Sequence, residues 1–489
     1  IFSVATRAQL DAFLRALQGV IDRHDILRTA FVWEGVNRPM QVVWRQASLS
    51  LAQFEFSSAM QDGDTRREEF LSLMSMAHMR MDMGKAPLIR LVAGHLDADK
   101  WMLSLNVHHM VCDHVSLEVV LQEVLACMRG QSAMLPEVVP YRDFVWCGLK
   151  RGTDEEASRY FTQRLASVEQ PCTLFDMADV HGGGQALQEA RQPLKPEIAL
   201  GLRAAARQLG VSPAAIVHVA WALVAGRCAG QSDVVFGSVL SGRMQGEASG
   251  HVRAHQGLGV FVNTLPVRVD LRAQSPGELV RATQRDLVEL IRFEQSSLAM
   301  AQRCSGVHGD EPLFNAVLNY RHSAAEQSSL GQLDGVRVLA SLERTNYPLS
   351  ISVDDYGTGF GLSTQTRWPA DAGRINAYME TALASLTQAL QAELDGGPSP
   401  CLTQLEVLPA GEKRLLLDTF SVSGTHQVQE LGMAPEVHQV HALFEAQARL
   451  RPDALAMRYG EQQWSYAQLD APADGLAAYL QSLGVKADT

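Results

Sequence analysis

The densest group of reactive side chains in the sequence is the run H-H-M-V-C-D-H at residues 108–114. It follows an apolar segment at 101–107 that predicts a strand, and it precedes a helical pattern for which Ser116 is a candidate N-cap. A turn between a strand and a helix can hold polar groups rigidly at the rim of a sheet. Because imidazole titrates near neutral pH, His109 could transfer a proton or hydrogen-bond a nucleophile. Asp113 could fix that imidazole or pair with a distant arginine.

The residue types in this run are compatible with three kinds of site. His109, Asp113 and His114 fit the H-x-H-x-D-H pattern of binuclear metal hydrolases, but Val111 stands at the position of a further ligand. The histidines could instead be structural, with their ring nitrogens bonded to backbone carbonyl groups. In the third interpretation, acyl transfer, an imidazole assists a nucleophile that attacks an acyl group. The spacing by itself leaves all three open.

Helical and strand patterns alternate irregularly around this run. Apolar residues recur at helical spacing over 10–21 and again over 117–128, and a further helix is expected after Asp64. Short strands are expected at 29–31, 41–44, 87–92 and 101–111. No fixed repeat period is present, so we expect an α/β or α+β protein rather than a solenoid or a helical bundle.

The second half of the chain continues the alternation. Ser212 and Pro213 open an apolar helix, as N-cap and first helical residue, and His218 and Trp221 inside it are expected to be core residues. Further strands are expected at 233–239 and 259–270, and 336–342 is expected to form a strand pair with 349–353.

Two features divide the C-terminal part of the sequence. The Gly- and Pro-rich run at 396–400 is the strongest linker signal in the chain. A short third region begins near residue 437, with a helix at 440–448, a hairpin around 459–460 and a second helix ending at 483–484. About 50 residues of this kind can hardly close a hydrophobic core alone.

Composition and charge exclude several classes of protein. The 489 residues are 46% hydrophobic and 20% charged, which is typical of a folded protein with about three domains. The formal net charge of −12 argues against nucleic-acid binding, and no apolar stretch reaches the roughly 18–20 residues of a membrane helix. Seven scattered cysteines without a C-x-x-C pair indicate a reducing, cytoplasmic setting. The start at Ile1 indicates a piece of a longer protein.

Several short motifs accompany the histidine run in a fixed order along the chain. His108 and His109, followed by Asp113, form an H-H-x-x-x-D pattern. Six further segments are R-H-D-I-L-R-T at 23–29, Y-R-D-F at 141–144, D-V-V-F-G-S-V-L-S-G-R at 233–243, G-V-F-V-N-T-L-P at 259–266, L-N-Y-R-H-S at 318–323 and N-Y-P-L at 346–349. As a set, over residues 1 to about 425, they resemble the condensation domains of nonribosomal peptide synthetases, relatives of chloramphenicol acetyltransferase.

The resemblance implies a fold and a domain organisation. It implies an α/β (α+β) protein in which two chloramphenicol acetyltransferase-like lobes form a V-shaped pseudo-dimer with a central tunnel. The N-terminal lobe would be 1–150, lacking its start, and the C-terminal lobe 151–425, followed by a linker at 426–436. Residues 437–489 resemble the start of an adenylation domain, through H-A-L-F-E-A-Q at 441–447, P-D-A-L-A at 452–456 and W-S-Y-A-Q-L at 464–469.

The resemblance also implies roles for individual residues. An acceptor α-amine would attack the thioester carbonyl of a donor and form an amide, with His109 as hydrogen-bond acceptor or general base. His108 would support the turn, and Asp113 would pair with Arg243 of the second lobe. The residues that could line the tunnel are Ser116, Tyr320, Arg321 and Ser350.

His114 departs from the family pattern, because most members carry Gly there. The Asp-His pair resembles the subgroup that accepts a D-configured donor residue, including dual domains that also epimerise the donor. His114 and Asn263 are expected to support the active site. The same fold could also serve as a non-catalytic module that recruits another enzyme.

The resemblance implies no metal and no diffusible cofactor. Both substrates would arrive on the 4'-phosphopantetheine arms of partner carrier domains, one upstream donor carrier and one downstream acceptor carrier. The adjoining adenylation domain is a further expected partner, whereas nucleic acid and membranes are not. The sequence from 437 lacks a nucleotide-binding loop, and the chain lacks a carrier-type serine motif, so it should neither activate nor carry amino acids.

Overall fold

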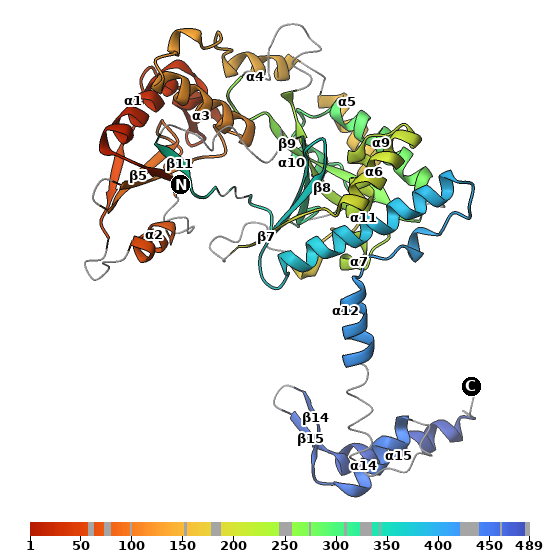
Figure 1. Ribbon diagram of the computed structural model, residues 1–489. Helices are drawn as coiled ribbons and strands as arrows, with labels where there is room; N and C mark the ends of the chain where they lie inside the picture. The colour runs from red at the N-terminus through yellow and green to blue at the C-terminus, as the bar shows by residue number, and fades with distance from the viewer. Residues whose placement is uncertain are drawn as a thin grey trace. The chain divides into compact units, whose positions relative to one another are not determined.

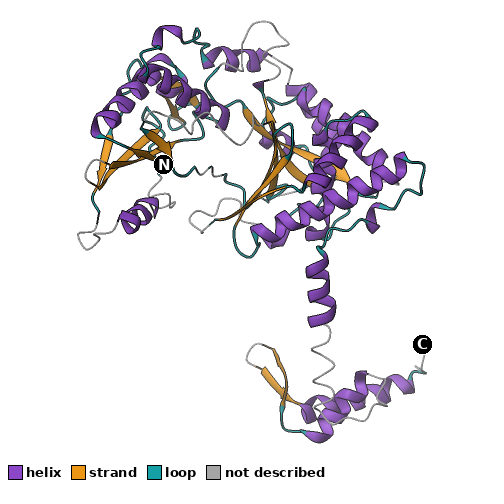
Figure 2. Cartoon of the chain, viewed as in Figure 1, coloured by secondary structure: helices purple, strands orange, loops and turns teal. Residues whose placement is uncertain are grey.

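The computed structural model of the chain comprises two compact units, Ile1–Pro409 and Ala410–Thr489. It describes residues 1–56, 63–72, 80–97, 100–150, 154–177, 187–243, 257–272, 275–307, 311–322, 335–341, 343, 345–420, 440–459 and 462–484. The first unit is a mixed α/β structure with two main sheets, each accompanied by helices (Figures 1 and 2).

The first sheet has five strands in the order β11-β1-β6-β5-β4. Its strands are β1 (Phe2–Val4), β4 (Leu51–Phe54), β5 (Ile89–Asp97), β6 (Lys100–Val107) and β11 (Val336–Val338). β4 and β5 run parallel, and the other neighbours are antiparallel. The predicted hairpin near the N-terminus is confirmed as β2 (Thr29–Val32) paired with β3 (Met40–Val43).

Two amphipathic helices accompany this sheet, and a third lies nearby in sequence. They are α1 (Arg7–Arg23), α3 (His114–Met128) and α2 (Gly63–Leu71). The apolar stripe predicted for the first helix is confirmed, because Leu10, Phe13 and Leu17 are fully buried in the core of this half. The Thr6 side chain caps α1 by accepting a hydrogen bond from the backbone N–H of Gln9.

The second sheet has six strands in the order β7-β13-β12-β10-β8-β9. Its strands are β7 (Gln188–Pro193), β8 (Asp233–Ser241), β9 (Val262–Asp270), β10 (Ala316–His322), β12 (Leu349–Asp355) and β13 (Phe360–Thr366). β10 runs parallel to both β8 and β12, and the remaining pairs are antiparallel.

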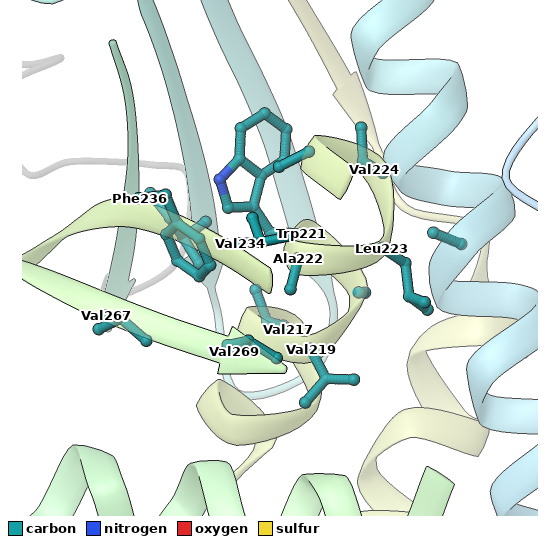
Figure 3. Close-up of a cluster of buried hydrophobic side chains, with 14 of the residues drawn as sticks. Val217, Val219, Trp221, Ala222, Leu223, Val224, Val234, Phe236, Val267 and Val269 are labelled. Carbon is teal, nitrogen blue, oxygen red and sulfur yellow. The ribbon is translucent and has the colours of Figure 1, made fainter. Parts of the chain in front are cut away.

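The helices of the second half pack around a core that centres on one apolar helix. The helices are α5 (Asp154–Leu165), α6 (Pro196–Leu209), α7 (Pro213–Ala229), α9 (Pro276–Ile291), α10 (Leu298–Arg303) and α11 (Ala372–Leu394), whereas α4 (Tyr141–Lys150) packs against the core of the first half. Ser212 caps α7, as predicted, and Trp221 is fully buried against the β8 and β9 side of the core (Figure 3). Burial lowers the pKa of His218 to about 4, so its ring is neutral, and its Nε2 lies 2.8 Å from the Ser238 hydroxyl.

The two sheets are not built from two separate halves of the sequence. β11 pairs with β1 in the first sheet, with Phe2 opposite Val338, although β11 lies between β10 and β12 of the second sheet along the chain. The prediction that 336–342 pairs with 349–353 is therefore wrong. Local patterns identify a strand, but its partner is chosen by the burial of its apolar side chains, and here Val336 packs into the first core.

The linker prediction at 396–400 is also wrong. The chain continues after it with Leu402, Leu405 and Val407, which are buried in the core of the second half. The Gly and Pro residues therefore form the turn that follows α11, and they do not separate domains. The linker predicted at 426–436 lies outside the described residues.

The second unit confirms the predicted order of helix, hairpin and helix. Its elements are α12 (Ala410–Arg414), η9 (Leu415–Phe420), α14 (Val440–Leu450), β14 (Leu455–Tyr459), β15 (Gln462–Ser465) and α15 (Tyr466–Ser482). Ser465 caps α15 and forms a capping box with Gln468. Of its described hydrophobic side chains, only Ala448 is buried, in agreement with the expectation that this stretch closes little core.

A search for membrane-spanning helices in the described residues finds no single helix of sufficient length and apolarity. α6 and α7 meet that test only together, as a pair bent by 114°. α7 is buried in the core from Ala215 to Gly226.

Candidate active site

The turn between β6 and α3 presents the histidine run. It is anchored by the backbone N–H of His108, which donates to Leu88 O at 3.0 Å, and by that of Val111, which donates to His108 O at 3.1 Å. Val111 is fully buried and Cys112 nearly so. The apolar residues in the middle of the run therefore hold the turn against the first core, and the histidines that flank them are left at its surface.

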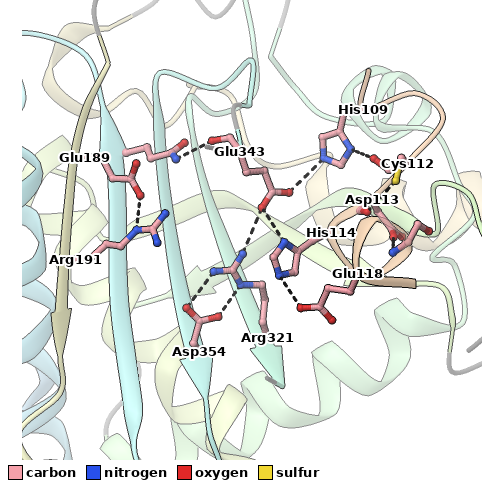
Figure 4. Close-up of polar contacts among 12 residues, drawn as sticks. His109, Cys112, Asp113, His114, Glu118, Glu189, Arg191, Arg321, Glu343 and Asp354 are labelled. Carbon is pink, nitrogen blue, oxygen red and sulfur yellow. Dashed lines mark hydrogen bonds and ion pairs between the residues drawn. The ribbon is translucent and has the colours of Figure 1, made fainter. Parts of the chain in front are cut away.

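His109 has a defined tautomer in this turn. Its Nδ1 lies 3.0 Å from the carbonyl oxygen of Cys112. Because a carbonyl can only accept, Nδ1 carries the proton and the lone pair of the neutral ring is on Nε2. The side chain is 41% exposed, and Nε2 lies 3.6 Å from Oε1 of Glu343 (Figure 4). His109 can therefore accept a proton at Nε2 from a group that reaches it from solvent.

His108 and Cys112 are more buried than His109. The backbone N–H of Met110 donates to Nδ1 of His108 at 3.2 Å, and burial, with a smaller effect of His109, lowers the pKa of His108. His108 is thus a neutral ring that braces the turn. Burial raises the pKa of the Cys112 thiol, which excludes a thiolate nucleophile.

Asp113 is buried and saturated with donors. Its Oδ1 accepts from the backbone N–H of Ser116 at 2.8 Å and from Nη2 of Arg243 at 2.8 Å. Its Oδ2 accepts from the backbone N–H of Phe261 at 3.1 Å. The structure thus brings Asp113 and Arg243 together as the resemblance implied. Asp113 joins the start of α3 to Arg243, which follows β8, and to Phe261, which precedes β9.

Ser116 does not have either of its predicted positions. Asp113, and not Ser116, is the N-cap of α3, because its carboxylate accepts a hydrogen bond from the backbone N–H of Ser116, the third residue of the helix. Ser116 lies within the first helical turn, fully buried. Its hydroxyl donates to Gly259 O at 2.7 Å and accepts from Arg243 Nη2 at 2.7 Å. It belongs to the buried junction and cannot line a passage.

Gly259 and Tyr141 complete this buried junction. Gly259 has φ of +152°, and a Cβ there would lie 2.1 Å from a ring carbon of Tyr141. The Tyr141 hydroxyl donates to Val260 O at 2.6 Å, and its backbone N–H donates to Asp25 at 3.0 Å. Five motifs that are far apart in sequence, beginning at residues 23, 108, 141, 233 and 259, therefore meet around one turn.

Glu343 is a site residue that sequence reasoning missed. Besides His109, it faces Nδ1 of His114 at 3.9 Å and Nη1 of Arg321 at 3.4 Å (Figure 4). The second half of the chain thus contributes a carboxylate beside His109. The only available signal was its position three residues before the N-Y-P-L motif at 346–349.

His114 lies in the same surface cluster as Glu343. Its Nε2 is 3.5 Å from Glu118, one helical turn further along α3. A hydrogen bond to Glu118 and the nearby charge of Glu343 raise the pKa of His114, against the opposing effect of burial. The ring stands beside the candidate catalytic histidine and not in the core.

Two residues predicted to line the tunnel, Tyr320 and Arg321, are neighbours on β10, so their side chains point to opposite faces of the second sheet. Arg321 on β10 is held by a two-pronged ion pair to Asp354, at 2.7 and 3.0 Å, and faces Glu343. Tyr320 points to the other face of the sheet, where its hydroxyl donates to Asp355 at 2.7 Å and where Arg203 of α6 also pairs with Asp355. Tyr320 therefore faces the helices, on the side of the sheet opposite to Arg321 and Glu343, and its place beside a passage stays a prediction.

The remaining predicted residues lie at the edges of this arrangement. Ser350 is buried, on the same face of β12 as Asp354 by strand alternation. Asn263 on β9 donates from its side-chain amide to the carbonyl oxygens of Glu294 and Ser296, each at 2.7 Å. It braces the turn after α9. The predicted tunnel stays a prediction.

The candidate metal ligands do not converge on one point. Both oxygens of Asp113 are occupied by protein donors, and His109 and His114 contact different carboxylate oxygens. Within the described ranges, no group of three His, Cys, Asp or Glu side chains is placed to hold a metal ion. The geometry thus disfavours the binuclear hydrolase interpretation and leaves an imidazole beside a carboxylate.

Comparisons with known proteins agree on one family. A family model described as Condensation domain matches residues 1–417. Malpinin synthetase of Mortierella alpina is 40% identical over 486 residues, which are 99% of this chain and 6% of that protein. A linear gramicidin synthase protein of Brevibacillus parabrevis is 29% identical over 98% of this chain and 6% of that protein. The chain thus spans only a small part of the length of these relatives.

Solved structures share the fold at low sequence identity. The first condensation domain of the calcium-dependent antibiotic synthetase, solved with a substrate analogue, has a TM-score of 0.59 and 16% identity, over 83% of this chain and 92% of that chain. The X-domain from teicoplanin biosynthesis, solved as a complex with OxyB, has a TM-score of 0.65 and 19% identity, over 83% of this chain and 90% of that chain.

Proposed function

The chain belongs to the condensation-domain family, the amide-bond-forming acyltransferases with the chloramphenicol acetyltransferase-like fold, and on this premise we propose that it elongates a carrier-bound peptide. In this proposal the α-amine of an aminoacyl chain on one carrier attacks the thioester of a peptidyl or acyl chain on another. The observation that carries the proposal is the state of His109: Nδ1 is bound to the Cys112 carbonyl, and Nε2 is accessible to accept a proton.

The reaction does not need a strong base. A free α-amine has a pKa of about 7.7–8.0, and an adjacent thioester lowers it, so much of the acceptor is neutral at pH 7. The amine lone pair forms the C–N bond, and the nitrogen then becomes positively charged. His109 Nε2 takes a proton from that nitrogen as the C–S bond breaks, and the released sulfur ends as a thiol. Holding the amine in line with the carbonyl is the larger part of the task.

The proposal includes the partners of the reaction. Donor and acceptor arrive on 4'-phosphopantetheine arms of separate carrier domains, and the chain itself holds no cofactor. The proposal also takes residues 437–489 as the start of an adenylation domain, supported by the motifs between residues 441 and 469. A cytoplasmic location is supported by the scattered cysteines, all seven of which are free thiols.

The proposal is tested with the purified chain, a donor carrier loaded with a peptidyl group and an acceptor carrier loaded with an amino acid. We expect a lengthened peptide on the acceptor carrier, detected by mass spectrometry of the released thioester. Absence of product with every donor and acceptor pair tried, from a folded chain, would favour the alternative of a non-catalytic recruitment module.

We further propose that the donor residue has the D configuration. His114, where most family members have Gly, supports this, because its ring extends toward the cluster around Glu343 next to His109. Matched donors that differ only in the configuration of the terminal residue should then differ in rate, with the D form faster. Equal rates would remove this part of the proposal.

Dual epimerisation and condensation is the alternative that the Asp-His pair also supports. In that case, an L-configured donor would exchange its α-proton before the amide forms. Incubation of an L-peptidyl carrier in deuterated water distinguishes the two. Deuterium at the donor α-carbon supports the dual activity, and its absence restricts the chain to condensation.

A further inference from the structure

Two hydrogen-bond acceptors converge beside the candidate catalytic histidine. The lone pair of His109 is on Nε2, because Nδ1 donates to the Cys112 carbonyl. Oε1 of Glu343 lies 3.6 Å from that Nε2, and it too can only accept when the carboxylate is ionised. Two acceptors cannot form a hydrogen bond with each other unless a donor hydrogen lies between them. A proton on the ring can do this, and so can the N–H groups of a ligand.

Glu343 is oriented by residues of the second sheet. Nη1 of Arg321 contacts Oε2 of Glu343 at 3.4 Å, while the rest of the guanidinium is fixed by the bidentate pair with Asp354. Oε2 also faces the ring of His114 at 3.9 Å. With Oε2 turned toward these two groups, Oε1 is the oxygen that faces His109. Glu343 and His109 are both partly exposed, at 38% and 41% of their side chains, so a ligand can reach the pair.

We infer that His109 and Glu343 together bind the amino group of the acceptor, which donates one N–H to Nε2 of His109 and a second N–H to Oε1 of Glu343. This inference rests on the proposed function. An amine nitrogen at about 2.9 Å from each acceptor spans two atoms that are 3.6 Å apart. With two N–H bonds fixed by these acceptors and the Cα bond held by the rest of the aminoacyl chain, the fourth tetrahedral position of the nitrogen, its lone pair, has a set direction. Glu343 is then a binding residue for the nucleophile, contributed by the other half of the chain.

The proton balance of the step is unchanged by Glu343. The lone pair of the amine forms the C–N bond, the proton donated toward Nε2 passes to His109, and the C–S bond breaks with the proton finally on sulfur. The hydrogen bond to Glu343 persists through the step, and it stabilises the positive charge that develops on nitrogen. The carboxylate needs to take up no proton.

The test compares primary-amine and N-methylated aminoacyl acceptors in the wild-type chain and in Glu343→Ala. A neutral secondary amine has a single N–H, which His109 uses, so it cannot also donate to Glu343. We expect Glu343→Ala to slow amide formation with the primary amine by about 10- to 100-fold, the loss of a hydrogen bond to a charged group. With the N-methylated acceptor the same substitution should change the rate little.

Glu118→Gln is the matched control. Glu118 is a carboxylate of similar exposure in the same cluster, 43% against 38%, but it faces His114 and not His109. We expect this variant to retain the wild-type ratio of the two acceptor rates. Glu343→Leu, which keeps much of the side-chain volume but has no hydrogen-bond acceptor, replaces Glu343→Ala if the melting temperature of the latter falls.

The outcomes separate this inference from the proposed function. If the wild type forms no amide, the proposed function fails. Suppose that the wild type is active. If the Glu343 variants then keep the wild-type rate, or lose the same factor in rate with the primary and the N-methylated acceptor, Glu343 does not bind the amine. A loss in Glu118→Gln as large as in Glu343→Ala would show a general effect of negative charge and would also overturn the inference.

Discussion

The two ends of the turn between β6 and α3 differ in almost every physical respect, although they are four residues apart. The side chain of His109 is 41% exposed, and its ring makes one hydrogen bond to the protein, through Nδ1. The side chain of Asp113 is 2% exposed, and its two oxygens accept from Ser116, Arg243 and Phe261. The His109 end of the turn is accessible to a substrate, whereas the Asp113 end is buried and hydrogen-bonded to other protein groups.

This difference shows how the fold separates reactivity from rigidity. A group that exchanges protons with a substrate has to keep an accessible lone pair, whereas its position has to be held by bonds made elsewhere. Here the position is held by a buried ion pair that joins two halves of the chain. The contrast predicts that substitutions at the exposed end change turnover and that substitutions at the buried end change stability.

The largest effect is expected for His109→Ala. Loss of the Nε2 acceptor should reduce the rate of amide formation by about 100- to 10,000-fold, the usual contribution of a general acid or base. The melting temperature should stay close to that of the wild type, because among the described residues the half-exposed ring makes one hydrogen bond, to the Cys112 carbonyl, and one exposed contact, with Glu343. Product formation with loaded carriers and a thermal melt measure both effects. His322→Ala, on an 81% exposed side chain, is the control.

Asp113→Ala is expected to be the strongest destabilising change. It leaves Arg243 buried without its carboxylate, and breaking one side of such a pair costs about 3–5 kcal/mol. Denaturant unfolding measures this loss, and Asp143→Ala, which removes a carboxylate with 53% exposure, should have almost no effect. Full stability together with lost turnover would make Asp113 catalytic and would abolish the contrast between the two ends.

A smaller loss is expected for Ser116→Ala. The substitution leaves the carbonyl and N–H of Gly259 and one contact of Arg243 without the buried hydroxyl, at a cost of about 1–3 kcal/mol. Because Asp113 still pairs with Arg243, the free energy of unfolding should fall by less than in Asp113→Ala. An equal loss in both variants, measured by denaturant unfolding, would mean that the hydroxyl and not the ion pair holds the junction.

The smallest effect, and one that depends on pH, is expected for His114→Asn. The pKa of His114 is raised in the folded state, so the folded protein binds the proton more tightly than the unfolded chain. Its contribution to stability is fully present below the ordinary pKa of about 6.5 and is lost as the pH rises through the raised pKa. The melting temperature of the variant should therefore be lower than that of the wild type at pH 6 and equal to it at pH 9. A constant difference across this range would contradict the assignment.

Local patterns were sufficient where a segment's structure depends on its own residues. The apolar stripe of α1, the cap of α7 by Ser212 and the helix–hairpin–helix order of the second unit all follow from side-chain periodicity and capping, which act over a few residues. The histidine run could likewise be singled out, because its reactive groups are adjacent in sequence.

Contacts between distant segments were beyond the reach of these patterns. The sequence alone determined which residues could form a helix, a strand or a reactive turn, since those choices depend on neighbours along the chain. Only the tertiary structure decided that β11 joins the first sheet, that Tyr320 faces away from Arg321's partners, and that Glu343 lies beside His109. These choices depend on which buried surfaces and charges meet when the chain folds, and residues hundreds of positions apart decide them together.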